Sequence, residues 1–179
     1  RDVNIALANE FSIICDKLNI NTNEMLTLAN HHPRVNFLQP GIGVGGHCLA
    51  VDPWFIVNSC PEEAKLIRTA REINDYKPEY VANNIIEEAK KRNATSIVCL
   101  GLTYKPNIDD CRESPAVEIV RTLAHSNYNI VVVEPNINSL PECLTKFNNV
   151  TLQSRKTLSI KNSMVITLVN HDIFKSMDL

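Results

Sequence analysis

The first half of the chain has its apolar residues at helical spacing. Between Asp2 and Leu18 they recur every three or four positions, which predicts a helix with no cap at its start. Asn21 followed by Glu24 resembles a capping box, so a second helix is expected to begin there and to stop before Pro33. Further helical runs are expected to start at residues 61 and 78, both prolines. Residues 1–92 are therefore predicted to be helical, and this region either pairs with another subunit or forms a bundle within one chain.

After Ser96 the pattern changes to short apolar runs. Strands are predicted over residues 97–102, 130–135, 150–152 and 164–169, and a helix over residues 115–126. This order predicts an α/β domain over residues 93–179, with a parallel sheet covered by helices. Ligands of such sheets bind at the carboxyl ends of the strands, where the loop over residues 103–115 carries Lys105 and Arg112. That loop is either a phosphate site or a solvated charged loop.

A glycine-rich segment that ends in a cysteine is the strongest candidate for chemistry. Four glycines within residues 41–46 precede Cys48, and bare backbone of this kind lets a ligand approach closely. The thiol is either a nucleophile, activated by a nearby cation or by hydrogen-bond donors, or a small buried side chain beside a tight turn. The glycines also spell G-x-G-x-x-G. A dinucleotide fingerprint is rejected because Pro40 precedes the segment and Pro53 is expected to interrupt any following helix.

Composition describes an ordinary globular chain. It has 179 residues, is 44% hydrophobic and carries a formal net charge of -2. The basic residues are scattered, which argues against a nucleic-acid partner, and the lack of a spanning run or leader argues against a membrane. The six cysteines show no C-x-x-C spacing. We expect a cytoplasmic protein in which most of these thiols lie in the core and no metal is bound.

Two long motifs carry a family resemblance. They are Gly-Val-Gly-Gly-His-Cys at residues 43–48 with Ala-Val-Asp-Pro-Trp at residues 50–54, and Gly-Leu-Thr-Tyr-Lys-Pro at residues 101–106 with the acidic pair 109–110 and Arg-Glu-Ser-Pro at residues 112–115. Over essentially its whole length the chain resembles the nucleotide-sugar 6-dehydrogenases of the UDP-glucose/GDP-mannose dehydrogenase family. His47 before the cysteine and Val-Asp-Pro at residues 51–53 after it resemble the branch of the family that acts on N-acetylated hexosamines. Ala50 with Trp54 resembles the pattern of the UDP-N-acetyl-D-mannosamine enzymes.

The resemblance implies a role for each of several residues. Family enzymes oxidise C6 of a UDP-sugar to a carboxylate with two NAD molecules, through a covalent intermediate on the cysteine. Cys48 is then the nucleophile, and Asp52 positions or deprotonates the hydrolytic water, unless it is only a turn residue before Pro53. The substrate contacts implied are Arg1, His32, Arg34, Gly46, Tyr104 and Lys105, with Arg34 reaching across a dimer, and Arg112 contacts NAD. His32 and Arg34 equally suit the C-terminal end of a helix, where cations complement the helix dipole.

The resemblance also implies a division of the chain. Residues 1–92 would be the central helical region through which a homodimer forms, and residues 93–179 a Rossmann-like UDP-binding domain that is short at its C-terminal end. An NAD-binding domain and a Lys-x-x-x-Asn motif are expected before Arg1, so the chain alone is expected to be an inactive fragment. The parent enzyme would oxidise UDP-N-acetyl-D-mannosamine for polysaccharide synthesis. Alternatives are oxidation of UDP-glucose or UDP-N-acetylglucosamine, and a noncatalytic module that binds UDP and dimerises.

Overall fold

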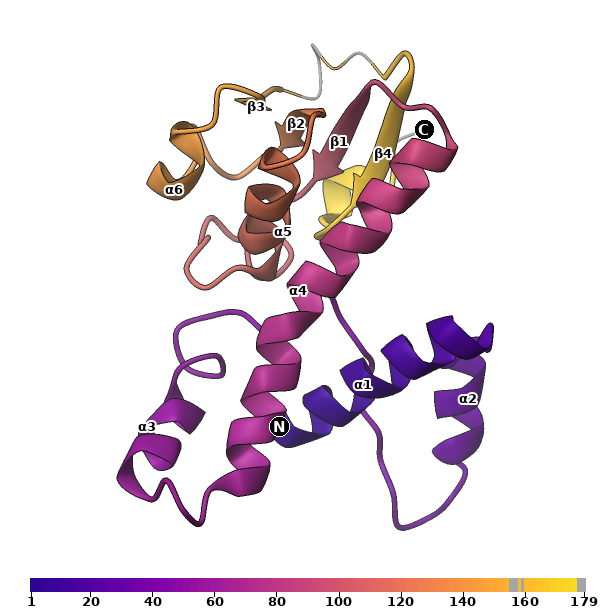
Figure 1. Ribbon diagram of the computed structural model, residues 1–179, viewed down its shortest axis with the longest axis vertical. Coiled ribbons are helices and arrows are strands. Elements are labelled where there is room, and N and C mark those ends of the chain that lie inside the picture. Colours follow the sequence, from indigo (N-terminus) through magenta and orange to yellow (C-terminus); the bar gives the residue numbers. More distant parts are fainter. Residues whose placement is uncertain (155–157, 159, 177–179) are drawn as a thin grey trace. The chain divides into compact units, whose positions relative to one another are not determined.

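The computed structural model describes residues 1–154, 158 and 160–176, and Figure 1 shows the course of the chain. The chain forms two compact units, residues 1–77 and residues 78–179. The first unit is helical, and the second contains a parallel β-sheet. The long helix α4 (Lys65–Lys91) contributes to both units.

Three helices precede α4 in the first unit. They are α1 (Asp2–Leu18), α2 (Thr22–Ala29) and α3 (Asp52–Ser59). The bounds of α1 confirm the predicted helix. The start of α2 also agrees, because the Asn21 side chain caps it by accepting a hydrogen bond of 3.1 Å from the Glu24 amide.

Two expectations based on proline were wrong. Pro53 does not interrupt a helix but lies in the first turn of α3, where its missing N–H costs no hydrogen bond. The two helices expected from Pro61 and Pro78 are one continuous helix, α4, which begins at Lys65 and contains Pro78 in its interior. Pro78 is buried within α4, so the preference of proline for a helix start did not predict its place in a helix interior.

The buried face of α1 is not its apolar stripe. Val3, Leu7 and Leu18 belong to the predicted stripe, yet all three are exposed, with Leu18 at 61%. The face that is buried carries small and polar residues, namely Asp2, Ala6, Ala8, Asn9, Ser12 and Cys15. The periodicity thus identified the helix correctly but not its inward face, which carries polar residues.

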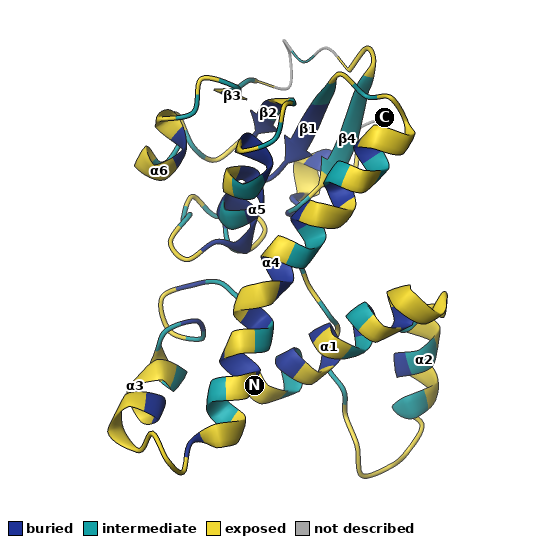
Figure 2. Ribbon diagram, in the orientation of Figure 1, coloured by how far each residue is buried: buried dark blue, intermediate teal, exposed yellow. Residues whose placement is uncertain are grey.

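The second unit has the predicted parallel sheet. Its strands are β1 (Ser96–Leu100), β2 (Asn129–Val133), β3 (Val150–Leu152) and β4 (Ser163–Thr167). They lie in the order β3-β2-β1-β4 and every pair is parallel, so all the carboxyl ends meet at one edge. Figure 2 shows that β1 and β2 are the most buried strands. This confirms the α/β fold.

Helices after the strands complete the second unit. Helix α5 (Pro115–Ala124) follows β1 and contacts β2, and its apolar residues are almost all buried. The short helix α6 (Glu142–Thr145) and the 3-10 helix η2 (Asp172–Phe174) were not predicted. Among the described residues, no helix has the length and apolar character needed to cross a bilayer.

The close approach of Gly101 to Val169 leads to a stability prediction. A Cβ at Gly101 would lie 2.5 Å from the Cβ of Val169 and 2.7 Å from its carbonyl oxygen, and the φ of Gly101 is +90°. We expect Gly101→Ala to lower the free energy of unfolding of the second unit by about 2–4 kcal/mol, because backbone strain at a positive φ and the steric clash with Val169 both destabilise the folded state. Urea denaturation measures this. Gly41→Ala, whose new Cβ would meet nothing closer than 3.5 Å, is the control and should change little.

Candidate functional site

Cys48 lies in a tight turn that leads into α3. Its carbonyl oxygen accepts hydrogen bonds from the amides of Val51 (3.0 Å) and Asp52 (2.7 Å), so Asp52 begins α3 one turn after the cysteine. Gly46, two residues earlier, is buried and has a φ of 92°, a conformation that favours glycine. Both Cys48 and Asp52 are exposed. The turn therefore brings an accessible thiol and a carboxylate to the same part of the surface.

The other cysteines are free as well, but two have thiols that ionise less readily than an ordinary cysteine. Complete burial raises the pKa of Cys99 to about 12, and burial followed by the negative charges of Glu134 and Asp110 raises the pKa of Cys111 to about 11. The expectation that most cysteines lie in the core was wrong. Among the described cysteines only Cys15 and Cys99 are buried. The others lie in loops (Cys48, Cys111) or at the ends of the short helices α3 and α6 (Cys60, Cys143).

These differences predict selective alkylation. The thiolate is the reactive form, so a thiol of pKa about 11 is ionised in roughly one molecule per thousand at pH 8. We expect iodoacetamide at pH 8 to label Cys48 while Cys99 and Cys111 stay unmodified in the native protein. Labelling of Cys111 should rise about tenfold per pH unit until the pH approaches 11. Peptide mass spectrometry gives the rate at each cysteine, and rapid labelling of Cys111 at pH 8 would contradict the assignment.

A buried polar cluster holds the turn against the helices. We call Asp2, Asn9, Arg71 and Asn74 the polar cluster of the first unit. Arg71, only 1% exposed, donates to the Asp2 carboxylate at 2.6 Å and lies 3.4 Å from the carbonyl oxygen of Leu49, next to Cys48. It also forms an ion pair with Asp75.

Amide side chains extend this cluster to the glycine segment. Asn74 donates to the Asp2 carboxylate at 2.8 Å, Asn9 donates to Asn74 at 2.9 Å, and the Gly41 amide donates to Asn9 at 2.8 Å. Sequence reasoning missed this cluster. The available signal was the recurrence of polar residues on the small-residue face of α1 and on one face of α4.

Three predicted substrate contacts lie elsewhere in the first unit. Arg1 is exposed at the N-terminus of α1. His32 and Arg34 lie in the exposed segment after α2, and the Nδ1 atom of His32 accepts a hydrogen bond of 3.2 Å from the Arg34 amide. The structure thus brings His32 and Arg34 together. In the polar cluster, Arg71 contacts both Asp2, which follows Arg1, and Leu49, which follows Cys48.

The remaining predicted residues lie in the second unit, on the loop after β1. The ammonium of Lys105 lies 5.5 Å from the ring centroid of Tyr104, a cation–π contact that leaves Lys105 exposed. Arg112, also exposed, donates to both carboxylate oxygens of Asp110 at 2.6–3.0 Å. These hydrogen bonds, with the attraction of the charges, raise the pKa of Arg112. Tyr104 and Lys105 therefore form one polar group, and Arg112 belongs to a separate ion pair.

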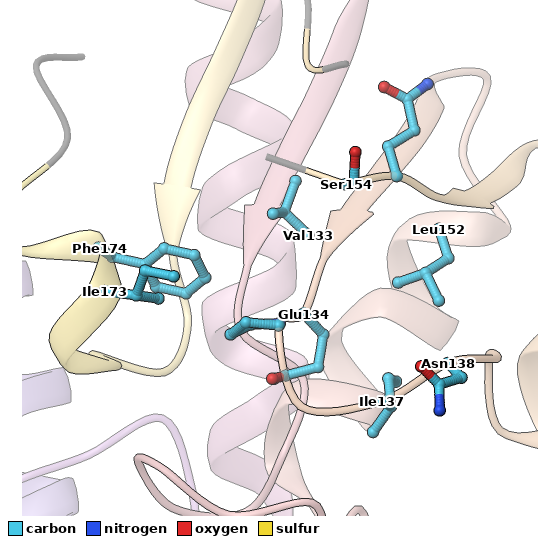
Figure 3. A pocket seen from close by; sticks show the side chains of 10 residues that line it. Val133, Glu134, Ile137, Asn138, Leu152, Ser154, Ile173 and Phe174 are labelled. Atoms are coloured by element: carbon cyan, nitrogen blue, oxygen red, sulfur yellow. The ribbon is translucent and has the colours of Figure 1, made fainter. Parts of the chain in front are cut away.

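A pocket of about 370 Å³ lies at the carboxyl ends of β2 and β3. Figure 3 shows Ile173 and Phe174 on one side of Glu134, and Leu152 and Ile137 on the other. None of the predicted site residues is among the described residues that line it. Glu134 is the charged residue in its wall, and both of its carboxylate oxygens already accept hydrogen bonds from the protein.

Comparison with known families identifies both units. The sequence profile of the UDP-glucose/GDP-mannose dehydrogenase family, central domain, matches residues 1–76, and the profile of the UDP binding domain of that family matches residues 98–179. The chain belongs to the UDP-glucose/GDP-mannose dehydrogenase family. The first match holds Cys48 and the polar cluster, and the second holds Tyr104, Lys105 and Arg112.

Individual relatives support the same family. The chain is 55% identical over 175 residues to a UDP-N-acetyl-D-mannosamine dehydrogenase of Campylobacter jejuni, covering 97% of this chain and 43% of that protein. It is 51% identical over 179 residues to an NDP-N-acetyl-D-galactosaminuronic acid dehydrogenase of Ralstonia solanacearum, covering 99% of this chain and 42% of that protein. The chain therefore spans about two fifths of the length of these curated relatives.

A solved structure gives the same picture. The UDP-N-acetyl-mannosamine dehydrogenase Cap5O from S. aureus superimposes with a TM-score of 0.84 at 42% sequence identity, covering 99% of this chain and 40% of that chain. This chain contains the two parts of the family that the profiles describe, the central domain and the UDP binding domain.

Proposed function

We propose that this chain is the thiol-bearing and UDP-binding part of an NAD-dependent 6-dehydrogenase that converts UDP-N-acetyl-D-mannosamine to the uronic acid. The observation that carries the proposal is the exposed Cys48, held in a glycine turn with Asp52 one helical turn away. Relatives named for this substrate, at 49–55% identity, support the choice of sugar. The whole protein would act in the synthesis of a surface polysaccharide.

We assign Cys48 to the second oxidation, in which the C6 aldehyde of the sugar becomes a carboxylate. An aldehyde is a poor hydride donor, but addition of the Cys48 sulfur to the aldehyde carbon gives a thiohemiacetal, which releases a hydride and a proton to leave a thioester. Water then attacks the thioester carbon, and Asp52 accepts the proton of that water. The acid leaves and the thiol is restored. NAD, when bound, supplies the hydride acceptor for both oxidations.

The described residues do not build a dinucleotide cradle. No strand leads into the glycine segment, and in the second unit the amides after β1 donate to a protein carboxylate. Arg112 is the one predicted NAD contact, and it is already paired with Asp110. Dinucleotide binding is therefore assigned to the N-terminal domain that the family resemblance implies. For the chain alone, a noncatalytic module is the better description.

Lys105 and Tyr104 are proposed to bind the UDP-sugar from the second unit, and Arg1, His32, Arg34 and Gly46 from the first. Lys105 is exposed, and its ammonium takes part in no ion pair among the described residues, so a diphosphate gains a charge-assisted hydrogen bond there. An arginine such as Arg34 grips two phosphate oxygens at once.

Residues 1–92 are proposed to form the homodimer. The apolar stripe of α1 supports this, because Leu7 and Ile14 are exposed, at 37% and 45%. A second copy of the chain would cover that stripe. The exposed free thiols of Cys48, Cys60 and Cys143 suit a reducing compartment, and we propose a cytoplasmic location on that ground.

The choice of sugar is tested by comparing specificity constants of the whole protein. We expect kcat/KM for UDP-N-acetyl-D-mannosamine to exceed those for UDP-N-acetylgalactosamine, UDP-N-acetylglucosamine and UDP-glucose, each by about tenfold or more. A higher constant for another sugar would replace the proposed substrate without changing the chemistry at Cys48. The 179-residue chain alone, given NAD and the sugar, should show no turnover. A rate near that of the whole protein would refute its proposed dependence on a further domain.

A further inference from the structure

A buried carboxylate lies where β2 ends, beside the loop that bears Lys105. Glu134 is 5% exposed, and its Oε2 atom accepts hydrogen bonds from the amides of Leu102 (2.7 Å) and Thr103 (3.3 Å). Its Oε1 atom accepts from the amide (3.0 Å) and side chain (3.1 Å) of Asn136. In dinucleotide-binding sheets, the amides after the first strand face a phosphate. Here the protein supplies its own anion to the equivalent amides.

His171 joins this carboxylate to the far end of the same loop. Its ring is fully buried, with Nε2 2.9 Å from Oε2 of Glu134, and its Nδ1 accepts a hydrogen bond of 2.9 Å from the Asn107 amide. Because an amide can only donate, Nδ1 is unprotonated, so the proton lies on Nε2 and is donated to Glu134. One buried pair thus binds both the start and the end of residues 102–107.

Further contacts fix the residues within and around this loop segment. The Thr103 hydroxyl donates to the carbonyl oxygen of Lys105 at 3.0 Å. Asn107 has a φ of 61°, its side chain donates to Asp172 at 2.7 Å, and the Asp172 amide donates back to it at 3.1 Å. Tyr104 and Lys105 lie between these anchored points.

We infer that Glu134 and His171 are positioning residues that hold the loop over residues 102–107 in the conformation that presents Lys105 to the diphosphate of the substrate. The inference rests on the proposed function for its ligand. Glu134 also satisfies the amides that would otherwise bind a phosphate directly, so the diphosphate is left to the side chain of Lys105. Neither positioning residue touches the substrate.

A double-mutant cycle in the whole protein tests this inference with UDP as the probe. Calorimetric Kd values are measured for the unmodified protein, Glu134→Gln, Lys105→Ala and the double variant. The glutamine amide has only one oxygen and cannot accept from both sides as the carboxylate does, so we expect Glu134→Gln to weaken UDP binding about tenfold. In the Lys105→Ala background the same change should weaken it less than about twofold, because residues that act through one another are not additive.

A general loss of stability is separated by a matched control. Val150→Ala truncates a buried side chain of β3 that is not among the described residues lining the pocket beside Glu134. This variant should have a lower melting temperature and an unchanged Kd for UDP. Equal weakening of UDP binding by Val150→Ala, or additive effects in the cycle, would overturn the inference. If Glu134→Gln does not fold, Thr103→Val is used in its place in the double-mutant cycle. That variant removes the hydrogen bond from the Thr103 hydroxyl to the Lys105 carbonyl oxygen.

Hydrogen exchange separates this inference from the proposed function. In protein without UDP, Glu134→Gln should raise amide exchange in peptides covering residues 102–107, while Val150→Ala should not. Unchanged exchange there would overturn the hold on the loop. If the unmodified protein fails to bind UDP, the proposed contact of Lys105 with the diphosphate is wrong, and so is the role of the loop in binding it. Raised exchange in Glu134→Gln would still establish that Glu134 and His171 hold residues 102–107 in place.

Discussion

Cys48→Ala in the whole protein is expected to reduce formation of the uronic acid by on the order of a thousandfold or more. The side chain is exposed in its turn, so its loss should leave the fold intact. Without the sulfur no thiohemiacetal forms, and the aldehyde lacks its path to a thioester. The measurement is the rate of uronic acid formation by mass spectrometry, with saturating NAD and UDP-N-acetyl-D-mannosamine.

Cys60→Ala is the matched control for this experiment. Cys60 is also exposed and follows α3, only twelve positions later in the chain. We expect this variant to keep the rate of the unmodified protein, which would show that removing a surface thiol near α3 has no general effect. Uronic acid formed at the normal rate by Cys48→Ala would show that the covalent mechanism is wrong, even if the family and the substrate were both correct.

Local patterns were enough to predict much of this fold. The strands of the second unit were found as short apolar runs, and α1 was found from its spacing, because both signals lie within one element. Proline misled the prediction at Pro53 and Pro78. Its preferences describe an isolated helix, whereas α4 continues through Pro78 within a packed protein.

The interior of the candidate sites could not be predicted in the same way. Glu134 and His171 are 37 positions apart, and Arg71 is 69 positions from Asp2, so only the folded chain brings each pair together. Cys48 and Asp52 were found because their motif is local. Glu134 could have been predicted as a site residue, because it directly follows an apolar strand at the edge of the sheet where ligands bind.

The largest expected effect on stability comes from Arg71. Replacing it with alanine leaves the buried Asp2 carboxylate without its cation, and loss of one member of a buried ion pair costs about 3–5 kcal/mol. Asn74 still donates to Asp2, but an amide does not neutralise its charge. Urea unfolding followed by fluorescence of Trp54, the one tryptophan and a residue of the same unit, measures the loss.

Two further variants test whether the loss of stability comes from the unpaired Asp2 carboxylate. Arg71→Met combined with Asp2→Asn removes both charges, and we expect it to recover at least about half of the loss, because a buried ion pair is often replaceable by neutral groups. Arg68→Ala, one turn earlier in α4, removes only a 3.3 Å hydrogen bond to the Pro61 carbonyl oxygen and should cost less than about 1 kcal/mol. If Arg71→Ala cost no more than Arg68→Ala, the polar cluster would not be what fixes α1, α4 and the Cys48 turn together.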